Sequence, residues 1–173
     1  MKKETDIQNT KIIKKGTILL NQGDVSLFGY KVIKGCLESY VIDKSGKEHI
    51  VQFAPEDWLI SDMGSLLNNT PSTLFIDAVE DSEVDFFNIK TFDKIEDLPN
   101  EMLVTQLKKL INNNIAINKR LVMMLTANAE ERYLDFIETY PSLVQRLPLK
   151  LIASYLGMTP EYLSDVRRKL SQK

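Results

Sequence analysis

Cysteine and histidine are almost absent from this chain, which has only Cys36 and His49 among 173 residues. One cysteine excludes an intrachain disulfide, a four-cysteine zinc site and an iron–sulfur cluster held by this chain's cysteines alone. One histidine gives little support for a Ser-His-Asp catalytic site and cannot by itself establish a haem site. We therefore expect no metal site and no cofactor, with Cys36 a small buried residue and His49 an ordinary strand residue.

Long apolar runs are absent as well. No stretch of about 18 apolar residues occurs, and the first six residues are not followed by the apolar core of a signal peptide. We therefore expect a cytoplasmic protein with no membrane association. The chain also lacks a Gly-rich phosphate loop, a cluster of metal ligands and a nucleophile motif, so we do not expect an enzyme and assign no catalytic residue.

The net charge of −2 hides an uneven distribution along the chain. Residues 142–173 carry six basic and two acidic side chains, so this end has a net charge of +4 and the remainder has −6. A basic end on an acidic body suits a module that meets phosphate groups while the rest of the chain stays away from them. A solvated basic tail is the alternative, unless the segment also has a recognisable fold.

Residues 11–88 consist of short apolar runs separated by Gly, Asn and Asp, a pattern typical of antiparallel strands and tight turns. The predicted strands are 18–20, 30–33, 37–42, 50–53, 74–79 and 84–89. Residues 59–69 are expected to form a short helical or loop insertion that ends in the breaker sequence Asn-Asn-Thr-Pro. The fold class is therefore α+β, beginning with an antiparallel β-roll or sandwich.

Residues 100–128 contain neither glycine nor proline and have helical periodicity, which predicts one long helix with Asn100 as its N-cap. Apolar residues with one polar member recur at alternating spacings of four and three, as in the seam of a coiled coil. This predicted dimerisation seam is Leu103, Leu107, Leu110, Asn114, Ile117, Leu121 and Met124. The alternative is that the stripe packs on the β domain and needs no second chain.

The C-terminal segment reads as helix, short turn, helix. Residues 129–140 form a first predicted helix, residues 149–156 a second, Gly157 caps it, and Thr159 caps a final helix that runs towards Leu170. This is the spacing of a DNA-binding helix-turn-helix, although the same shape also occurs in protein-only roles. Arg167 and Arg168 would contact phosphate or guanine. The residues predicted to bind DNA are Thr159, Glu161, Tyr162, Ser164, Asp165, Arg167, Arg168 and Lys169.

Taken in order, these parts resemble the Crp/Fnr family of transcription regulators over nearly the whole chain. The matching motifs are KGTILLNQGD at 15–24, YKVIKG at 30–35, the Gly46 turn, EDSEV at 80–84 and, most specifically, LKLIASYLGMTPEYLS at 149–164. The resemblance implies a β-roll sensor domain at 1–97, a dimerisation helix at 98–128 and a helix-turn-helix domain at 129–173. It also implies a homodimer that places residues 159–170 in the DNA major groove, with RNA polymerase as a further candidate partner.

Two motifs depart from the cyclic-nucleotide-binding members, which carry a Gly-Glu-Leu turn and an Arg followed by Ser or Thr. Here the positions read Ser61-Asp62-Met63 and Pro71-Ser72-Thr73, so Ser72 stands where the phosphate-binding Arg would be. We therefore expect no tight binding of cyclic AMP, and the effector is unknown. Asp62, Ser72 and Thr73 could line a pocket for a less anionic ligand, but an empty or filled-in pocket is the stronger expectation.

The C-terminal helix departs from the family too. Asp165 stands where many members have an Arg, and an acid facing DNA costs binding unless it accepts from cytosine or pairs with Arg168 or Lys169. The chain ends about where the recognition helix does, so no following wing is expected. The alternative function is an orphan small-molecule sensor or protein-interaction module in which the helix-turn-helix is vestigial.

Overall fold

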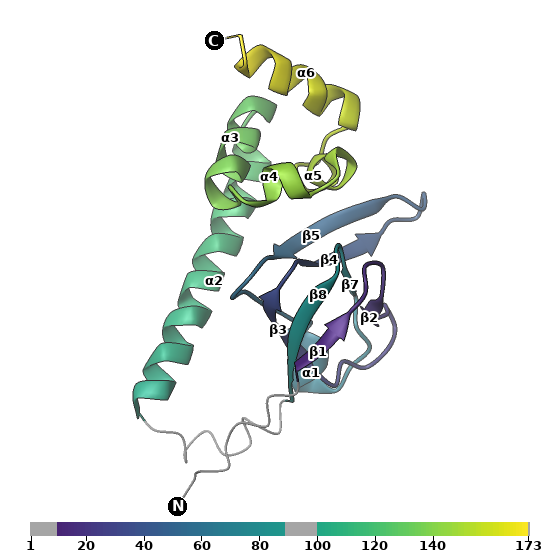
Figure 1. Cartoon of the computed structure of the whole chain (residues 1–173), viewed down its shortest axis with the longest axis vertical. Helices are drawn as coiled ribbons and strands as arrows, with labels where there is room; N and C mark the ends of the chain where they lie inside the picture. The colour runs from purple at the N-terminus through teal and green to yellow at the C-terminus, as the bar shows by residue number, and fades with distance from the viewer. Residues whose placement is uncertain (1–9, 89–99, 173) are drawn as a thin grey trace, which may run out of the picture. The chain divides into compact units, whose positions relative to one another are not determined.

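The computed structural model describes residues 10–88 and 100–172, which divide into two compact units (Figure 1). The first is a β unit and the second is helical. The predicted boundary between roll and long helix, at residues 97 and 98, lies outside the described residues. No described helix is long and apolar enough to cross a membrane.

The β unit contains two antiparallel four-stranded sheets. One has the order β1 (Thr10–Ile13), β8 (Ser82–Phe87), β3 (Gly29–Lys34) and β6 (Leu59–Ile60); the other has β2 (Ile18–Leu20), β7 (Phe75–Ala78), β4 (Leu37–Ile42) and β5 (Glu48–Ala54). Helix α1 (Met63–Asn68) follows β6. The predicted antiparallel roll is confirmed, and the 59–69 insertion consists of β6 and α1.

The core of the β unit is formed by the inward-facing residues of both sheets. Val32 pairs with Val84 across β3 and β8, and Leu37 pairs with Ala78 across β4 and β7. All four side chains are buried, and removing one Val or Leu side chain from water contributes about 1.5–3 kcal/mol. The short apolar runs that predicted the strands therefore supply the side chains that fill the space between the sheets.

The three residues Gly35, Cys36 and Ser82 meet at one turn of the roll. Gly35 has φ +93°, and a Cβ there would lie 2.3 Å from the Ser82 hydroxyl oxygen, so this position requires glycine. Cys36 follows it fully buried, and its backbone N–H donates to the same hydroxyl at 3.1 Å. His49 lies in β5, with Nε2 2.6 Å from a carboxylate oxygen of Asp43. Both residues are placed as predicted.

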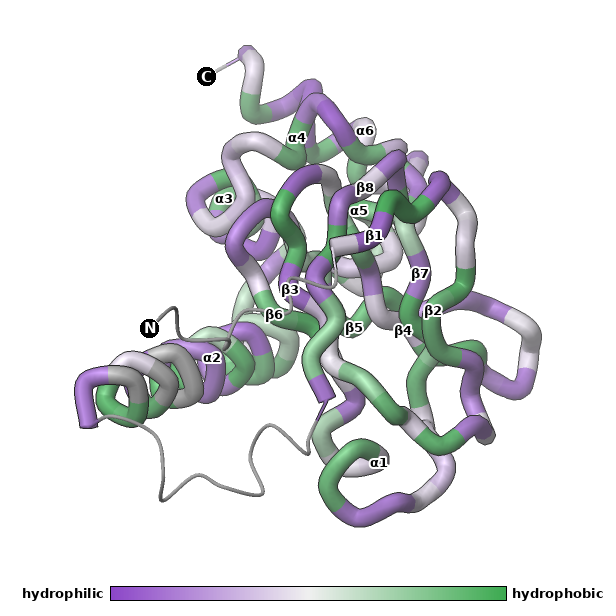
Figure 2. Tube along the Cα trace, turned by 60° about the horizontal axis from the view of Figure 1, so that its bottom comes forward, coloured by the Kyte–Doolittle hydropathy of each residue, from purple (hydrophilic) through white to green (hydrophobic). Residues whose placement is uncertain are grey.

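The helical unit comprises five helices within the described residues. They are α2 (Asn100–Thr126), α3 (Ala129–Thr139), α4 (Leu143–Arg146), α5 (Leu149–Tyr155) and α6 (Pro160–Leu170). Figure 2 shows hydrophobic and hydrophilic residues alternating around the coil of α2. The helix begins at Asn100 itself, so the prediction of Asn100 as N-cap is wrong by one position, and the cap falls outside the described residues.

The long helix α2 ends at Thr126, two residues earlier than predicted. Only Ala127 and Asn128 link it to α3, and Asn128 belongs to the start of the next helix. Asn128 adopts an extended conformation and caps α3: its side chain accepts from the N–H of Glu131 at 3.0 Å. The Glu131 carboxylate accepts in return from the N–H of Asn128 at 2.9 Å. This reciprocal capping box satisfies two N–H groups and fixes the direction in which α3 leaves.

Candidate nucleic-acid interface

Gly157 and Thr159 build the turn between α5 and α6. Gly157 has φ +66° and its N–H donates to the Ser154 carbonyl at 3.1 Å, while the N–H of Met158 donates to the Ala153 carbonyl at 3.0 Å. These two bonds form a Schellman motif, which ends a helix and needs a left-handed residue. Leu156 is the C-cap, so Gly157 stands one position beyond it. The predicted helix-turn-helix spacing is present.

Thr159 begins α6 as predicted. Its backbone is extended, its side-chain oxygen accepts from the N–H of Tyr162 at 3.2 Å, and Pro160 occupies the first helical position. Leu163 and Val166 are buried where α6 contacts α3 and α5, and Ile152 of α5 and its C-cap residue Leu156 are buried too. Leu149 and Leu170, the apolar residues at the outer ends of the two helices, are partly exposed.

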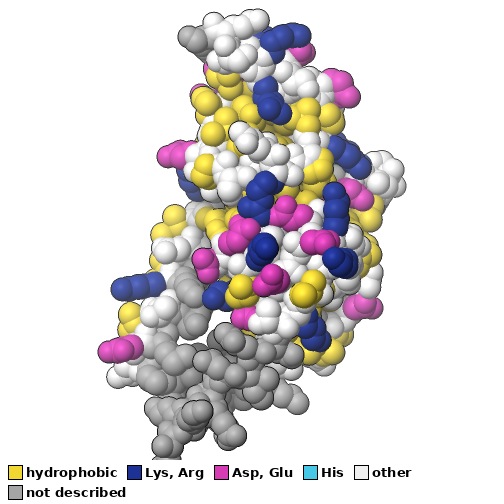
Figure 3. All heavy atoms as spheres, viewed as in Figure 1, with side chains coloured by type: hydrophobic (Ala, Val, Ile, Leu, Met, Phe, Trp, Pro, Cys, Tyr) yellow, Lys and Arg dark blue, Asp and Glu magenta, His cyan; other side chains and the backbone are white. Residues whose placement is uncertain are grey.

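The buried side of α6 determines which residues face outward. Because successive residues are about 100° apart, Glu161, Ser164, Asp165 and Arg168 lie opposite Leu163 and Val166. Tyr162 and Lys169 flank them on one side and Arg167 on the other. All are exposed except Asp165, which is half-buried. The structure thus places four of the residues predicted to bind DNA on the outer face of α6 and three on its flanks, with Thr159 at the cap that precedes them. Acidic and basic side chains are both visible at the α6 end in Figure 3.

Asp165 and Arg168 form an ion pair on this surface. One carboxylate oxygen of Asp165 lies 2.7 Å from Nη2 of Arg168, one helical turn away, and both side chains are exposed enough for the pair to be weak, about 0–1 kcal/mol. Of the two ways in which an acid here could be tolerated, pairing with a basic neighbour is therefore present in the single chain. The three basic residues near the C-terminus of α6 also oppose the negative end of the helix dipole. They therefore have a structural role that is independent of any partner.

The predicted dimerisation seam lies on an exposed side of α2. Leu107, Ile117 and Leu121 are each more than half exposed in the single chain, and Asn114 and Met124 are exposed too. Leu103 is half-buried, and the side chain of Leu110 lies outside the described residues. Sequence analysis missed a second exposed stripe beside the first: Val104, Ile111, Ile115, Val122 and Leu125. An exposed apolar surface of this kind is typical of interaction faces.

Asp62 fills the region predicted as a possible pocket. Its carboxylate accepts from the N–H of Ser65 at 3.0 Å, capping α1, and its other oxygen lies 2.8 Å from the hydroxyl of Ser72 and 3.2 Å from the N–H of Thr73. Burial alone would raise the pKa of Asp62, but these hydrogen bonds outweigh it and lower the pKa. The three predicted residues thus come together, with Ser72 and Thr73 both donating to the carboxylate of Asp62.

A family model for the cyclic nucleotide-binding domain matches residues 10–97, just over half of the chain. The chain belongs to the cyclic nucleotide-binding domain family. The matched residues include Asp62, Ser72 and Thr73, and Asp62 takes three hydrogen bonds there. Among the described residues, no group of three or more His, Cys, Asp or Glu side chains is placed to hold a metal ion.

Relatives of this family member extend the similarity beyond the β unit. The anaerobic regulatory protein of Aggregatibacter actinomycetemcomitans is 30% identical over 173 residues, covering 91% of this chain and 65% of that protein. The protein of the same name from Pasteurella multocida is 28% identical, covering 96% and 64%. The chain therefore spans just under two thirds of the length of these relatives.

Solved structures share the fold over nearly the whole chain. FixK2 from Bradyrhizobium japonicum matches with a TM-score of 0.78 at 16% identity, covering 94% of this chain and 84% of that one. A CooA mutant from Carboxydothermus hydrogenoformans matches with 0.75 at 16% identity, covering 94% and 76%. At such identity only the fold is shown. Together with the named relatives, these matches confirm the resemblance to Crp/Fnr regulators.

Proposed function

We propose that this chain is the sensor and DNA-binding part of a dimeric Crp/Fnr-type transcription regulator that inserts α6 into the major groove. The observation that carries the proposal is the α5–α6 geometry: a Schellman turn at Gly157, a cap at Thr159 and an outer face of polar residues. Arg167, Arg168 and Lys169 would neutralise phosphates, and Glu161 would accept from cytosine.

The apolar surface of α2 supports the dimeric part of the proposal. A second copy of this chain is the occupant we favour, because the seam has coiled-coil spacing and a single polar member, Asn114. Two helix-turn-helix units would then read half-sites about one DNA turn, roughly 34–36 Å, apart. RNA polymerase would be a further partner, and such a regulator acts in the cytoplasm without enzymatic activity.

The Asp62 network supports a sensor that does not take cyclic AMP. A cyclic phosphate would meet the Asp62 carboxylate with no arginine at position 72 to neutralise it. Constitutive DNA binding is compatible with a region already filled by Asp62.

The second candidate is a protein-interaction or small-molecule sensor module with a vestigial helix-turn-helix. The Asp165–Arg168 pair favours it, because this pair engages one of the basic side chains on the outer face of α6 and adds a negative charge there. Salt dependence separates the two functions, since DNA binding through several cations weakens steeply as salt rises.

The test is fluorescence anisotropy on a randomised duplex pool at low and physiological salt, followed by sequencing of the retained DNA. Arg167→Ala/Arg168→Ala should abolish retention. Lys44→Ala/Lys47→Ala is the matched control, because it removes the same charge from the exposed turn between β4 and β5. A two-fold symmetric motif lost only in the α6 variant would support the regulator. No retention at either salt, or equal retention by both variants, would overturn it.

A further inference from the structure

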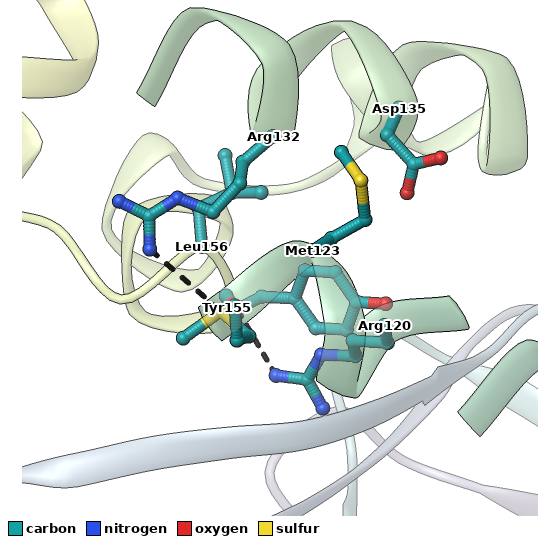
Figure 4. A pocket seen from close by; sticks show the side chains of 7 residues that line it. Arg120, Met123, Arg132, Asp135, Tyr155 and Leu156 are labelled. Carbon is teal, nitrogen blue, oxygen red and sulfur yellow. Dashed lines mark hydrogen bonds between the residues drawn. The ribbon is translucent and has the colours of Figure 1, made fainter. Parts of the chain in front are cut away.

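The last turns of α2 are attached to the helix-turn-helix through Arg120. Nη2 of Arg120 donates to the backbone carbonyl of Tyr155 at 3.0 Å, and the guanidinium carbon lies 3.9 Å from the centre of the Tyr155 ring (Figure 4). Tyr155 is the last residue of α5, so the cation meets a carbonyl at the negative end of that helix. One side chain therefore makes a hydrogen bond and a cation–π contact to the same residue.

The Tyr155 ring is itself held in place by α3. It lies 5.6 Å from the ring of Phe136 and 5.8 Å from the ring of Tyr140, centre to centre, in tilted and edge-on arrangements. Burial lowers the pKa of Arg120 from its usual range, while the neighbouring tyrosines raise it, and the guanidinium stays protonated. The Arg120 guanidinium is thus positioned by the Tyr155 ring of α5, which is in turn held by the Phe136 ring of α3.

Two neighbours of Arg120 on α2 add contacts to the same unit. Lys119 forms an ion pair with Asp135 of α3 at 2.5 Å. Met124 lies against the turn before α6, since a Cβ on Gly157 would come within 2.8 Å of its methyl group. The end of α2 therefore contacts α3, α5 and the α5–α6 turn through side chains. These contacts add to the two-residue backbone link between α2 and α3.

These contacts differ in how strictly they fix an angle. Lys119 is half exposed and its ammonium is a point charge, so its pair with Asp135 tolerates rotation. The Arg120 guanidinium is planar and satisfies a ring face and a carbonyl at once, which restricts both its distance and its orientation. Arg120 and Tyr155 are 35 residues apart in sequence, so this restriction acts directly between α2 and α5 rather than along the backbone.

We propose that Arg120 is a positioning residue, which sets the angle of the helix-turn-helix on α2 through its contacts with Tyr155. Resting on the proposed function, this angle fixes the spacing of the two half-sites that a dimer reads. A movement of α2 reaches α6 through the same contact. Loss of the guanidinium should widen the range of angles between α2 and the helix-turn-helix, without changing which bases α6 recognises.

The first experiment measures the angle without DNA. Spin labels are placed on exposed α2 and α6 positions by Lys108→Cys and Lys169→Cys in a Cys36→Ser background, and labelled chains are diluted with unlabelled ones. The doubly labelled chain with Arg120 in place should give one narrow distribution of distances between the labels at positions 108 and 169. Arg120→Lys, which keeps the charge but not the planar fork, should at least double its width. Arg120→Met, which keeps the apolar stem, should do the same.

Arg132→Lys is the matched control, since it makes the same change in the same cleft at a side chain directed to the Met124 sulfur, 3.8 Å away. It should leave the distribution narrow. Circular dichroism and thermal unfolding identify variants whose helices have not formed. Folded Arg120→Lys and Arg120→Met chains with the wild-type distribution would overturn the proposal.

The second experiment uses fixed half-sites joined by spacers of varied length. Wild type should select one spacing, and Arg120→Lys should accept at least two more with unchanged base preference within each half-site. A purely structural role would instead lower retention equally at all spacings. If wild type binds no DNA but Arg120→Lys broadens the label distances, the proposed function fails and the role of Arg120 within the chain stands. If wild type reads DNA and Arg120→Lys keeps its spacing and distances, the Arg120 proposal fails alone.

Discussion

The Asp62 carboxylate and the buried Ser72 hydroxyl lie 2.8 Å apart, joining the N-terminus of α1 to the segment that leads into β7. We expect Asp62→Ala to lower the free energy of unfolding by about 1–2 kcal/mol, because it removes the cap of α1 and a partner of Ser72. Asp62→Asn should cost less, since asparagine also caps helices. Chemical denaturation followed by the fluorescence of Trp58, the single tryptophan, reports on the β unit.

The pH dependence of this effect follows from the lowered pKa of Asp62. A carboxyl whose folded pKa is depressed stabilises the fold above its unfolded pKa, about 3.9, and loses that contribution as pH falls through the folded pKa. The difference between wild type and Asp62→Asn should therefore be full at pH 6 and shrink below about pH 4. A difference that grows on acidification would contradict the hydrogen-bonded carboxylate.

Cyclic AMP should leave the thermal unfolding of the wild-type chain unchanged. A ligand present at 100 times its dissociation constant stabilises the folded state by about 2.7 kcal/mol, which a melting curve detects easily. Differential scanning fluorimetry at millimolar nucleotide, with adenosine monophosphate as control, makes the comparison. A rise in midpoint specific to cyclic AMP would show that the Asp62 network opens to admit a phosphate.

Gly157→Ala should destabilise the helical unit by about 1–2 kcal/mol, because an L side chain at φ +66° carries the left-handed penalty. A further cost comes from Met124, whose methyl group must move. Gly46→Ala is the matched control: its φ is +83°, but no atom lies within 4 Å of the added Cβ. Adding Met124→Ala should recover part of the Gly157→Ala loss if the two residues are in contact, as measured by helical circular dichroism.

Asp165→Asn should raise DNA affinity several-fold at low salt and steepen the salt dependence by about one phosphate contact, because Arg168 loses its partner. Stability should change by less than about 0.5 kcal/mol, as expected for an exposed pair. Anisotropy over a salt series provides the measurement. Weaker binding by the variant would mean instead that Asp165 accepts a hydrogen bond from cytosine.

The two apolar stripes of α2 can be distinguished by one charge on each. Leu121→Glu alters the predicted dimerisation seam and Val122→Glu alters the second stripe, and both side chains are 56% exposed in the single chain. We expect Leu121→Glu to convert a dimer to a monomer in sedimentation velocity, because the seam would bury an unpaired charge. If Val122→Glu has this effect and Leu121→Glu does not, the dimer uses the second stripe.

Sequence patterns predicted the parts of the fold whose signals are local. Short apolar runs separated by turn residues indicated most of the strands, and Thr159 with Pro160 indicated the start of α6. Strands β1 and β6 and helix α4 were not predicted as elements, because two to four residues are too few to display a period.

The rest of the candidate site depends on tertiary packing. The outer face of α6 was predictable from helical periodicity, and so was the seam of α2. Nothing in the sequence pairs Arg120 with Tyr155, because their contact depends on the direction that the Asn128 capping box gives to α3. The second stripe of α2 did carry a signal, since Val104, Ile111 and Leu125 share a seven-residue period, but a single seam was traced.

The pairing of β1 with β8 has a consequence for how the chain folds during synthesis. Thr10 and Asp85, partners in this ladder, are 75 residues apart, so the β unit cannot close its first sheet until β8 has left the ribosome. The contact between Arg120 and Tyr155 spans less than half that distance. The roll therefore keeps β1 unpaired until its last strand emerges, and the helical unit, whose helices follow β8 in the chain, completes its fold later, once α5 and α6 have emerged.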